Sequence, residues 1–181
     1  MRIRPAQPDD LPRLMELTRE AFGPSAWSEA LMRDILDAAR QRPWLQVARV
    51  LELEYTPPLA GSFGGEAIGV DSPAAHAELP LWLAGYLIMQ IVGMDAEIQS
   101  LAVDPRWQRH GFGHALLADS LSLAVNRRLH RLFLEVRASN LAAQQFYLHR
   151  GFEIYGRRTR YYHSPVEDAL LMRRPVAPRA G

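Results

Sequence analysis

The stretch Glu97-Ile-Gln-Ser-Leu101-Ala-Val103-Asp-Pro105-Arg-Trp-Gln108-Arg-His-Gly111-Phe-Gly113-His114 decides the fold of this 181-residue chain. An apolar strand runs into a proline, then into a short basic loop with two glycines, and then into a helix rich in alanine and leucine. The first N–H groups of a helix lack internal partners and lie at the positive end of its dipole, so they can hold a diphosphate. Gly111 and Gly113 would let that backbone come close, and Arg109 would add charge. An ordinary tight turn that opens a helix is the alternative interpretation.

Composition limits the class of protein. The net charge is only +1 with acids and bases interspersed, which predicts no direct nucleic-acid binding and no membrane partner. The chain has no cysteine, which fits a reducing compartment, and Met1-Arg-Ile-Arg-Pro5 lacks an apolar signal region. No apolar run approaches the roughly 18 residues that a membrane-spanning helix needs. We therefore expect a cytoplasmic protein with one domain over residues 1–174.

Hydrophobic spacing and turn residues predict an order of elements that gives a mixed α/β sandwich. The first helix is expected to begin at Asp9 or Asp10, and the second to be capped by Ser28 and to continue through Leu31, Ile35 and Leu36. Further helices are expected at 111–128 and from Ser139 to His149, again with a serine cap. The strands are expected at 2–4, 43–53, 81–91, 96–103, 131–138, 152–162 and 169–172.

Residues 55–80 break this pattern. They contain four glycines and four prolines with no sustained periodicity, which predicts an irregular surface insertion, mobile without acceptor, rather than a core element. We expect replacement of residues 57–78 by a short linker to leave folding intact. The prolines near the C-terminus likewise predict a frayed tail over residues 175–181.

Several polar side chains stand in apolar surroundings. Glu135 interrupts an apolar strand, where an ionised carboxylate without a partner would be costly. It is either ion-paired with Arg137, two residues on and on the same face, or catalytic. Asn140 and Tyr147 are seven residues apart and can face one ligand from the same side of a helix. A helix cap for Asn140 and a core position beside Phe146 for Tyr147 are the structural alternatives.

Two histidines and a tryptophan have structural alternatives as well. His110 and His114 are four residues apart and could share a metal, but no third ligand stands at a suitable spacing, so we expect no metal and interpret both as loop residues. Trp27 is typical of a packing aromatic rather than of a ligand contact.

These motifs together resemble a known family. The run from Val103 to Gly113 resembles the Q/R-x-x-G-x-G/A acyl-CoA loop of the GNAT superfamily of N-acetyltransferases. Glu135-Val-Arg-Ala-Ser-Asn140 with Tyr147, Arg160-Tyr-Tyr162 and Glu167-Asp-Ala-Leu-Leu-Met172 are similar to stretches of RimI-type ribosomal protein alanine N-acetyltransferases. The resemblance covers residues 1–55 loosely and 81–174 closely. It implies an α/β, GNAT-like fold with a mixed, mostly antiparallel central sheet flanked by helices, whose splayed central strands bind acetyl-CoA.

The resemblance also implies roles for single residues. Glu135 would be the general base, and Tyr147 the proton donor for the departing thiolate. In the family, a bulged strand turns backbone N–H groups towards the thioester. Leu101, Ala102 and Val103 would belong to this strand, and a plain buried strand is the alternative for these three residues. Glu97, Tyr161 and Tyr162 would line the acceptor side, with exposed strand positions as the alternative. The implied acetyl-CoA contacts are Leu101, Ala102, Val103, Arg109, His110, Gly111, Phe112, Gly113, His114 and Asn140.

The implied activity is transfer of acetyl from acetyl-CoA to the N-terminal α-amine of a protein, with alanine of a small-subunit ribosomal protein as the substrate. An acetyltransferase acting on lysine or a small amine remains an alternative, because loops such as 55–80 decide the acceptor. A non-catalytic acyl-CoA-binding module is the second alternative. RimI-type enzymes have Pro-Trp-Ser where this chain has Ala26-Trp27-Ser28, and we expect this change to loosen the turn because alanine does not fix φ.

Overall fold

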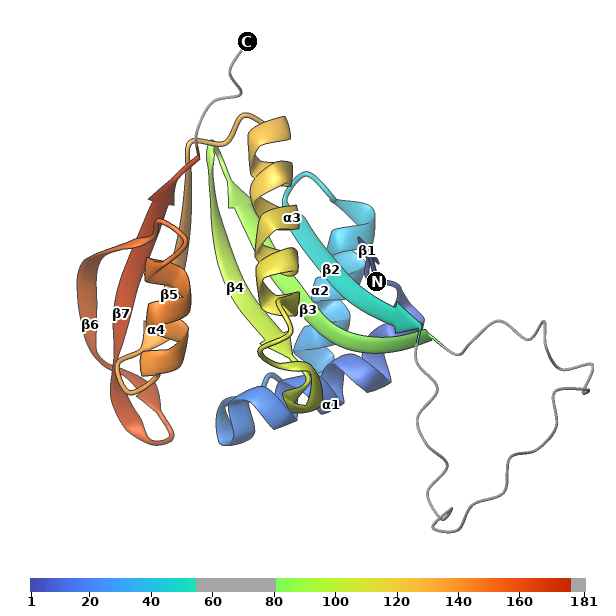
Figure 1. The fold of residues 1–181 in the computed structure, drawn as a ribbon, viewed down its shortest axis with the longest axis horizontal. Helices are drawn as coiled ribbons and strands as arrows, with labels where there is room; N and C mark the ends of the chain where they lie inside the picture. The colour runs from blue at the N-terminus through green and yellow to red at the C-terminus, as the bar shows by residue number, and fades with distance from the viewer. Residues whose placement is uncertain (55–80, 177–181) are drawn as a thin grey trace, which may run out of the picture.

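The computed structural model describes residues 1–54 and 81–176, so the predicted insertion at 55–80 and residues 177–181 lie outside the described residues. The strands are β1 (Arg2–Pro5), β2 (Gln46–Glu54), β3 (Leu81–Val92), β4 (Asp95–Val103), β5 (Arg131–Arg137), β6 (Glu153–His163) and β7 (Val166–Pro175). The α-helices are α1 (Leu11–Phe22), α2 (Glu29–Gln41), α3 (Phe112–Asn126) and α4 (Leu141–Leu148), as Figure 1 shows.

The strands form one sheet in the order β1-β2-β3-β4-β5-β7-β6. All neighbours are antiparallel except β4 and β5, which run parallel because α3 connects them as a crossover helix. The predicted fold class, a mixed and mostly antiparallel sheet flanked by helices, is confirmed. Within the described ranges, no helix is long and apolar enough to cross a membrane.

Helices cover both faces of the sheet, and each pair has its own core (Figure 1). On one face α3 and α4 pack over β3, β4 and β5, with Leu117 and Leu132 fully buried between them. On the other face α1 and α2 pack over β2, β3 and β4, with Leu17 and Met32 buried against Val50. The β5 side chains alternate between these faces, as the pleat requires, which gives Glu135 the face opposite to Leu134.

Predictions at several segment ends were wrong. β7 continues to Pro175, and Val176 is buried and donates its N–H to His130 O at 2.8 Å, so residues 175 and 176 do not belong to a frayed tail. Asn140 rather than Ser139 caps α4, since its Oδ1 accepts from Ala143 N–H at 3.0 Å.

Other local predictions are confirmed. The hydroxyl of Ser28 caps α2 by accepting from Leu31 N–H at 3.2 Å, and α1 begins directly after Asp10. Ala26 has a φ of −60°, close to the value that proline would fix, so the turn keeps a geometry that proline could adopt, and the expected loosening stays a prediction.

The end of β4 is anchored by a carboxylate. Asp104 is 0% exposed and accepts hydrogen bonds from Arg13 Nη2, from the Arg106 backbone N–H and guanidinium, and from Trp82 Nε1 at 3.3 Å. Both guanidiniums lie over the Trp82 ring, at 4.6 and 4.8 Å from its centroid. Burial raises the pKa of the Asp104 carboxyl, but the hydrogen bonds from Arg106 and Trp82 outweigh it and hold the pKa below its ordinary value.

Replacing Asp104 by asparagine should lower the free energy of unfolding by roughly 3 kcal/mol, because two arginines lose their buried partner. The matched control is Asp95→Asn, which breaks the exposed pair with Arg131 and should cost under about 1 kcal/mol. Urea unfolding measures both values. Because the folded-state pKa of Asp104 is depressed, its contribution is present above about pH 4 and is lost as pH falls through the folded pKa. Equal losses in the two variants would show that Asp104 is no anchor.

Candidate active site

The candidate site begins where β4 and β5 separate. The two strands pair from Asp95 and Arg131 to Ile98 and Leu134, and beyond that pair they diverge. A bulge contributes to this divergence, because Ile88 pairs with Ser100 and Met89 with Ile98, which leaves Gln99 without a partner in β3. Glu135 is therefore the first residue of β5 after the pairing with β4 ends.

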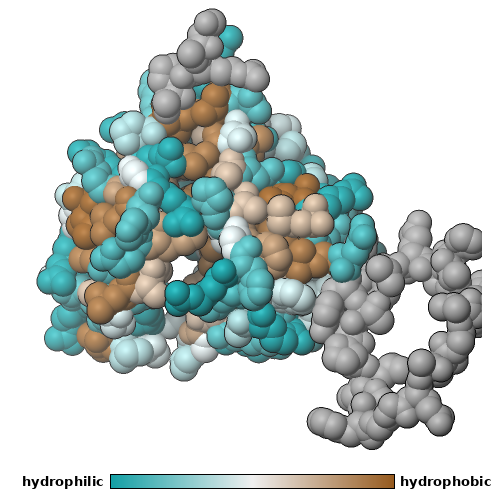
Figure 2. Space-filling view, viewed as in Figure 1, coloured by the Kyte–Doolittle hydropathy of each residue, from teal (hydrophilic) through white to brown (hydrophobic). Residues whose placement is uncertain are grey.

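A cavity of about 350 Å³ occupies the space between the diverging strands, and we call it the splay cavity. Figure 2 shows the surface hollowed at this place, between α4 and the loop that precedes α3. Its wall includes residues from α1, β4, β5, α4 and β6, so the cavity extends from one face of the sheet to the other. The lining residues are Ala21, Phe22, Ser25, Trp27, Ile98, Gln99, Ser100, Leu101, Leu134, Glu135, Val136, Arg137, Asn140, Ala143, Tyr147 and Tyr162.

The Glu135 carboxylate has partners on β6 and not on its own strand. Its Oε1 lies 2.7 Å from Arg158 Nη1, and its side chain is 16% exposed. The predicted ion pair with Arg137 is wrong, because Arg137 instead contacts Glu167 at 3.0 Å and Ser25 Oγ at 2.6 Å. Although Glu135 and Arg137 share a face of β5, each forms its ion pair with a residue of another strand, Glu135 with Arg158 of β6 and Arg137 with Glu167 of β7.

A second cavity adjoins the site on the other side of Glu135, and we call it the acidic cavity. It has a volume of about 360 Å³, and Glu97, Glu135, Arg158 and Tyr161 are among its lining residues. Burial raises the pKa of the Glu97 carboxyl, the charge of Glu135 raises it further, and Arg158 opposes both. A hydrogen bond to Glu135 raises the pKa of the Tyr161 hydroxyl. Because Glu135 lines both cavities, it can contact ligands in either one.

Tyr147 lies on α4, across the splay cavity from the acidic cavity. It is 8% exposed and packs edge-on against Phe146 and Phe152, with ring centroids 5.0 and 5.4 Å away. Tyr147 is thus both a core aromatic and a cavity residue, and its two alternatives do not exclude each other. Burial raises the pKa of its phenol far above the ordinary value, so the group stays protonated at neutral pH. Asn140 likewise caps the helix and lines the cavity.

The predicted phosphate loop lies at the start of α3. Gly111 is the residue directly before the helix. Its φ of +84° is a backbone conformation that residues with a side chain rarely adopt. Arg109 also has a positive φ of 63° and is exposed. The first helical bond at this end runs from Ala115 N–H to Gly111 O at 2.9 Å, so the N–H groups of residues 112–114 precede the internal ladder. These groups fit a diphosphate held at a helix N-terminus.

Aromatic packing shapes the loop. The His110 ring lies 6.1 Å from Phe112 and 5.9 Å from Trp107, and its Nδ1 is 2.8 Å from Gln108 O. His114 does not face His110 as a paired ligand would, since its Nδ1 accepts from Arg150 Nε at 3.1 Å. Among the described residues, no group of three histidines and carboxylates could hold a metal ion.

The strand residues predicted to contact acetyl-CoA do not all reach the cavity. Leu101 lines the splay cavity, whereas Ala102 is buried in the core beneath α1 and α2, and Val103 packs towards α3. All three pair in register with β3, and the bulge lies two residues earlier, at Gln99. Contacts from Ala102 and Val103 would therefore have to come from their backbone.

Sequence reasoning missed several residues of the site. Arg158, the partner of Glu135, belongs to β6, and its role depends on a strand pairing that no local pattern shows. Phe22 lines the splay cavity from the end of α1. Trp27 packs against the α1 and α2 core, as predicted, and also lines the cavity. A positive φ of 52° at Arg160 marks the bulge in β6 that precedes Tyr161.

The sequence profile of the acetyltransferase (GNAT) family matches residues 11–152, most of the chain. The chain belongs to the GNAT acetyltransferase family. The predicted resemblance to this family is confirmed by that match and by the splayed parallel strands of the sheet.

Other GNAT proteins extend the comparison. The chain is 37% identical over 142 residues to a putative ribosomal protein bS18-alanine N-acetyltransferase of Bacillus subtilis, covering 75% of this chain and 93% of that protein. It is 39% identical over 97 residues to the ribosomal protein bS18-alanine N-acetyltransferase of Escherichia coli K12, covering 52% of this chain and 66% of that protein. The crystal structure of the Escherichia coli ribosomal-protein-S18-alanine N-acetyltransferase superposes with a TM-score of 0.71, at 28% identity, over 99% of this chain and 96% of the other.

Two substitutions at Gly113 test the phosphate loop. A Cβ built there would meet Phe146 and Val103 side chains no closer than 3.5 Å, which is ordinary contact, so Gly113→Ala should leave coenzyme A affinity nearly unchanged. Gly113→Asp should weaken it by about tenfold or more, because the carboxylate would repel a diphosphate at the helix N-terminus. Calorimetry with coenzyme A measures both. Unchanged affinity in Gly113→Asp would mean that the diphosphate binds elsewhere.

Proposed function

We propose that this chain transfers an acetyl group from acetyl-CoA to the N-terminal α-amine of a protein, with an N-terminal alanine of a small-subunit ribosomal protein as the acceptor. The observation that carries the proposal is the position of Glu135, which lines both the splay cavity and the acidic cavity. A carboxylate at that junction can contact an acceptor from one side and a thioester from the other. The relatives are named as N-acetyltransferases of alanine in ribosomal protein bS18, and the proposed acceptor is taken from those names.

The loop at the start of α3 fits the diphosphate of acetyl-CoA, because it offers first-turn N–H groups, an open backbone at Gly111 and the charge of Arg109. Gln99, Leu101 and Asn140 would border the rest of the molecule in the splay cavity. When bound, acetyl-CoA supplies an activated thioester carbonyl. Backbone N–H groups of the β4 edge that faces the splay would be the donors that stabilise negative charge on its oxygen.

Glu135 would act as the general base. An α-amine has a pKa of about 7.7 to 8.0 and is mostly protonated at neutral pH, so it must lose a proton before it can attack. Arg158 and Tyr161 hold the Glu135 carboxylate in place beside the acidic cavity. Tyr147, whose phenol stays protonated because burial raises its pKa, would give its proton to the departing thiolate.

A peptide panel tests the acceptor. After incubation with acetyl-CoA, mass spectrometry should find one acetyl group at the α-amine of a peptide with N-terminal alanine, and none on the same peptide with a blocked N-terminus and an internal lysine. Acetylation of lysine or of a polyamine would replace the proposed acceptor by an ε-amine or a small amine. Binding of acetyl-CoA without release of its thiol in the presence of any acceptor would indicate a non-catalytic module.

Glu135→Gln should lower the rate of acetyl transfer by roughly 10² to 10⁴, because it removes the base and leaves the α3 loop intact. Affinity for coenzyme A should hardly change. The matched control is Glu153→Gln, which removes a carboxylate from the exposed pair with Arg173 on the same sheet and should keep wild-type turnover. Wild-type turnover by Glu135→Gln at neutral pH would assign the base to another residue.

A further inference from the structure

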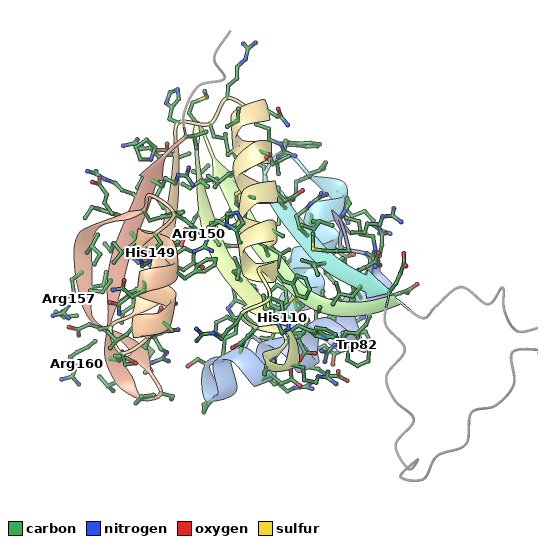
Figure 3. The ribbon with its side chains drawn as sticks, in the orientation of Figure 1. Trp82, His110, His149, Arg150, Arg157 and Arg160 are labelled. Atoms are coloured by element: carbon green, nitrogen blue, oxygen red, sulfur yellow. The ribbon has the colours of Figure 1, made fainter. Side chains whose placement is uncertain are left out.

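A second basic site lies beside the phosphate loop, between α3 and the end of α4. It is a groove of about 380 Å³ whose lining includes the basic side chains His114, His149, Arg150 and Arg174, and we call it the basic groove. Apolar α3 residues such as Leu117 form its floor. Figure 3 shows His149 and Arg150 at the end of α4, with Arg150 directed towards α3. The groove thus begins at His114, three residues after Gly111.

Arg150 is held in a fixed orientation. Its Nε donates to His114 Nδ1 at 3.1 Å, its Nη1 donates to Phe146 O at 2.8 Å, and its guanidinium lies 3.9 Å from the Phe146 ring centroid. Because His114 Nδ1 accepts this bond, the neutral imidazole carries its proton on Nε2 and keeps one N–H to donate. A preorganised guanidinium beside an imidazole donor is a suitable arrangement for a phosphate group.

The charges of the groove are not neutralised within the described residues. No carboxylate contributes to the groove lining, and neither Arg150 nor Arg174 forms an ion pair in the described part of the chain. The adjacent Arg173 does form one, with Glu153 at 2.8 Å. Arg174 also stays close to Gly151, where a Cβ would meet its Nε at 3.5 Å. Two guanidiniums and two imidazoles without a carboxylate favour a dianion as the ligand.

We propose that the basic groove binds the 3′-phosphate of coenzyme A and so distinguishes coenzyme A from dephospho-coenzyme A. This inference rests on the proposed function, because it assumes that the diphosphate binds at residues 111–114. The ribose that carries the 3′-phosphate is attached directly to that diphosphate, and the groove begins in the same first turn of α3. His114 would contact both phosphate groups, and Arg150 and Arg174 would contact the 3′-phosphate.

Calorimetry with coenzyme A and dephospho-coenzyme A tests this assignment by the ratio of the two dissociation constants. The wild type should bind coenzyme A about 10- to 100-fold more tightly, the effect of one or two charge-assisted hydrogen bonds. In Arg150→Gln and in Arg174→Gln this ratio should fall towards one, through weaker binding of coenzyme A alone. Arg173→Gln is the matched control, since it removes the same charge from the neighbouring residue and should keep the wild-type ratio.

Several results would overturn the inference. A wild type that binds both cofactors equally would have no 3′-phosphate site, although its loop would still bind the diphosphate and the proposed function would stand. A wild-type ratio in Arg150→Gln and in Arg174→Gln would place the 3′-phosphate elsewhere. Equal weakening of both cofactors in Arg150→Gln would assign that arginine to the packing of α4 against α3. A wild type that binds neither cofactor would remove the proposed function together with the groove.

Discussion

The early end of the pairing between β4 and β5 is the constraint on which the candidate site depends. Two parallel strands joined by a helix would ordinarily remain paired, yet these separate after Ile98 and Leu134. The bulge at Gln99 and the anchor at Asp104 both hold the second half of β4 towards β3 and α1. The backbone groups along the gap then need water or a ligand as partners. Acetyl-CoA carries amide groups along its length, so it can take the place of a missing strand.

Under the proposed function, the same divergence would let Glu135 and Tyr147 act in one reaction from opposite faces of the sheet. Side chains of β5 alternate, so Leu134 and Val136 join the core beneath α3 and α4 while Glu135 faces the other way. In a closed sheet the backbone of β4 would separate Glu135 from α4. With the strands apart, both residues line one cavity. Glu135 could therefore take a proton from the acceptor amine while Tyr147 gives one to the departing thiolate, without a covalent enzyme intermediate.

Much of this arrangement could be predicted from local sequence. The periodicity of the helices, the cap at Ser28 and the glycine loop at Gly111 depend on residues close in the chain, and the structure has each of them. What could not be predicted depends on contacts between distant segments. The pairing of Glu135 with Arg158 needs the bulged strand β6, and the anchor at Asp104 combines residues of α1, β3 and the loop after β4. Burial of Val176 likewise follows from its hydrogen bond to His130, which composition near the C-terminus does not indicate.

The charges around Glu135 set a condition that any mechanism must meet. Arg158 Nη1 lies 2.7 Å from Glu135 Oε1, so a guanidinium faces the carboxylate at hydrogen-bonding distance. Glu97 lines the same cavity, where burial raises the pKa of its carboxyl and the charge of Glu135 raises it further. A protonated α-amine that enters the acidic cavity would meet the carboxylates of Asp95, Glu97 and Glu135 and one guanidinium, so its charge would be attracted overall. Under the proposed function the amine needs only a modest shift to lose its proton, so a carboxylate at the junction of the two cavities would be a suitable proton acceptor.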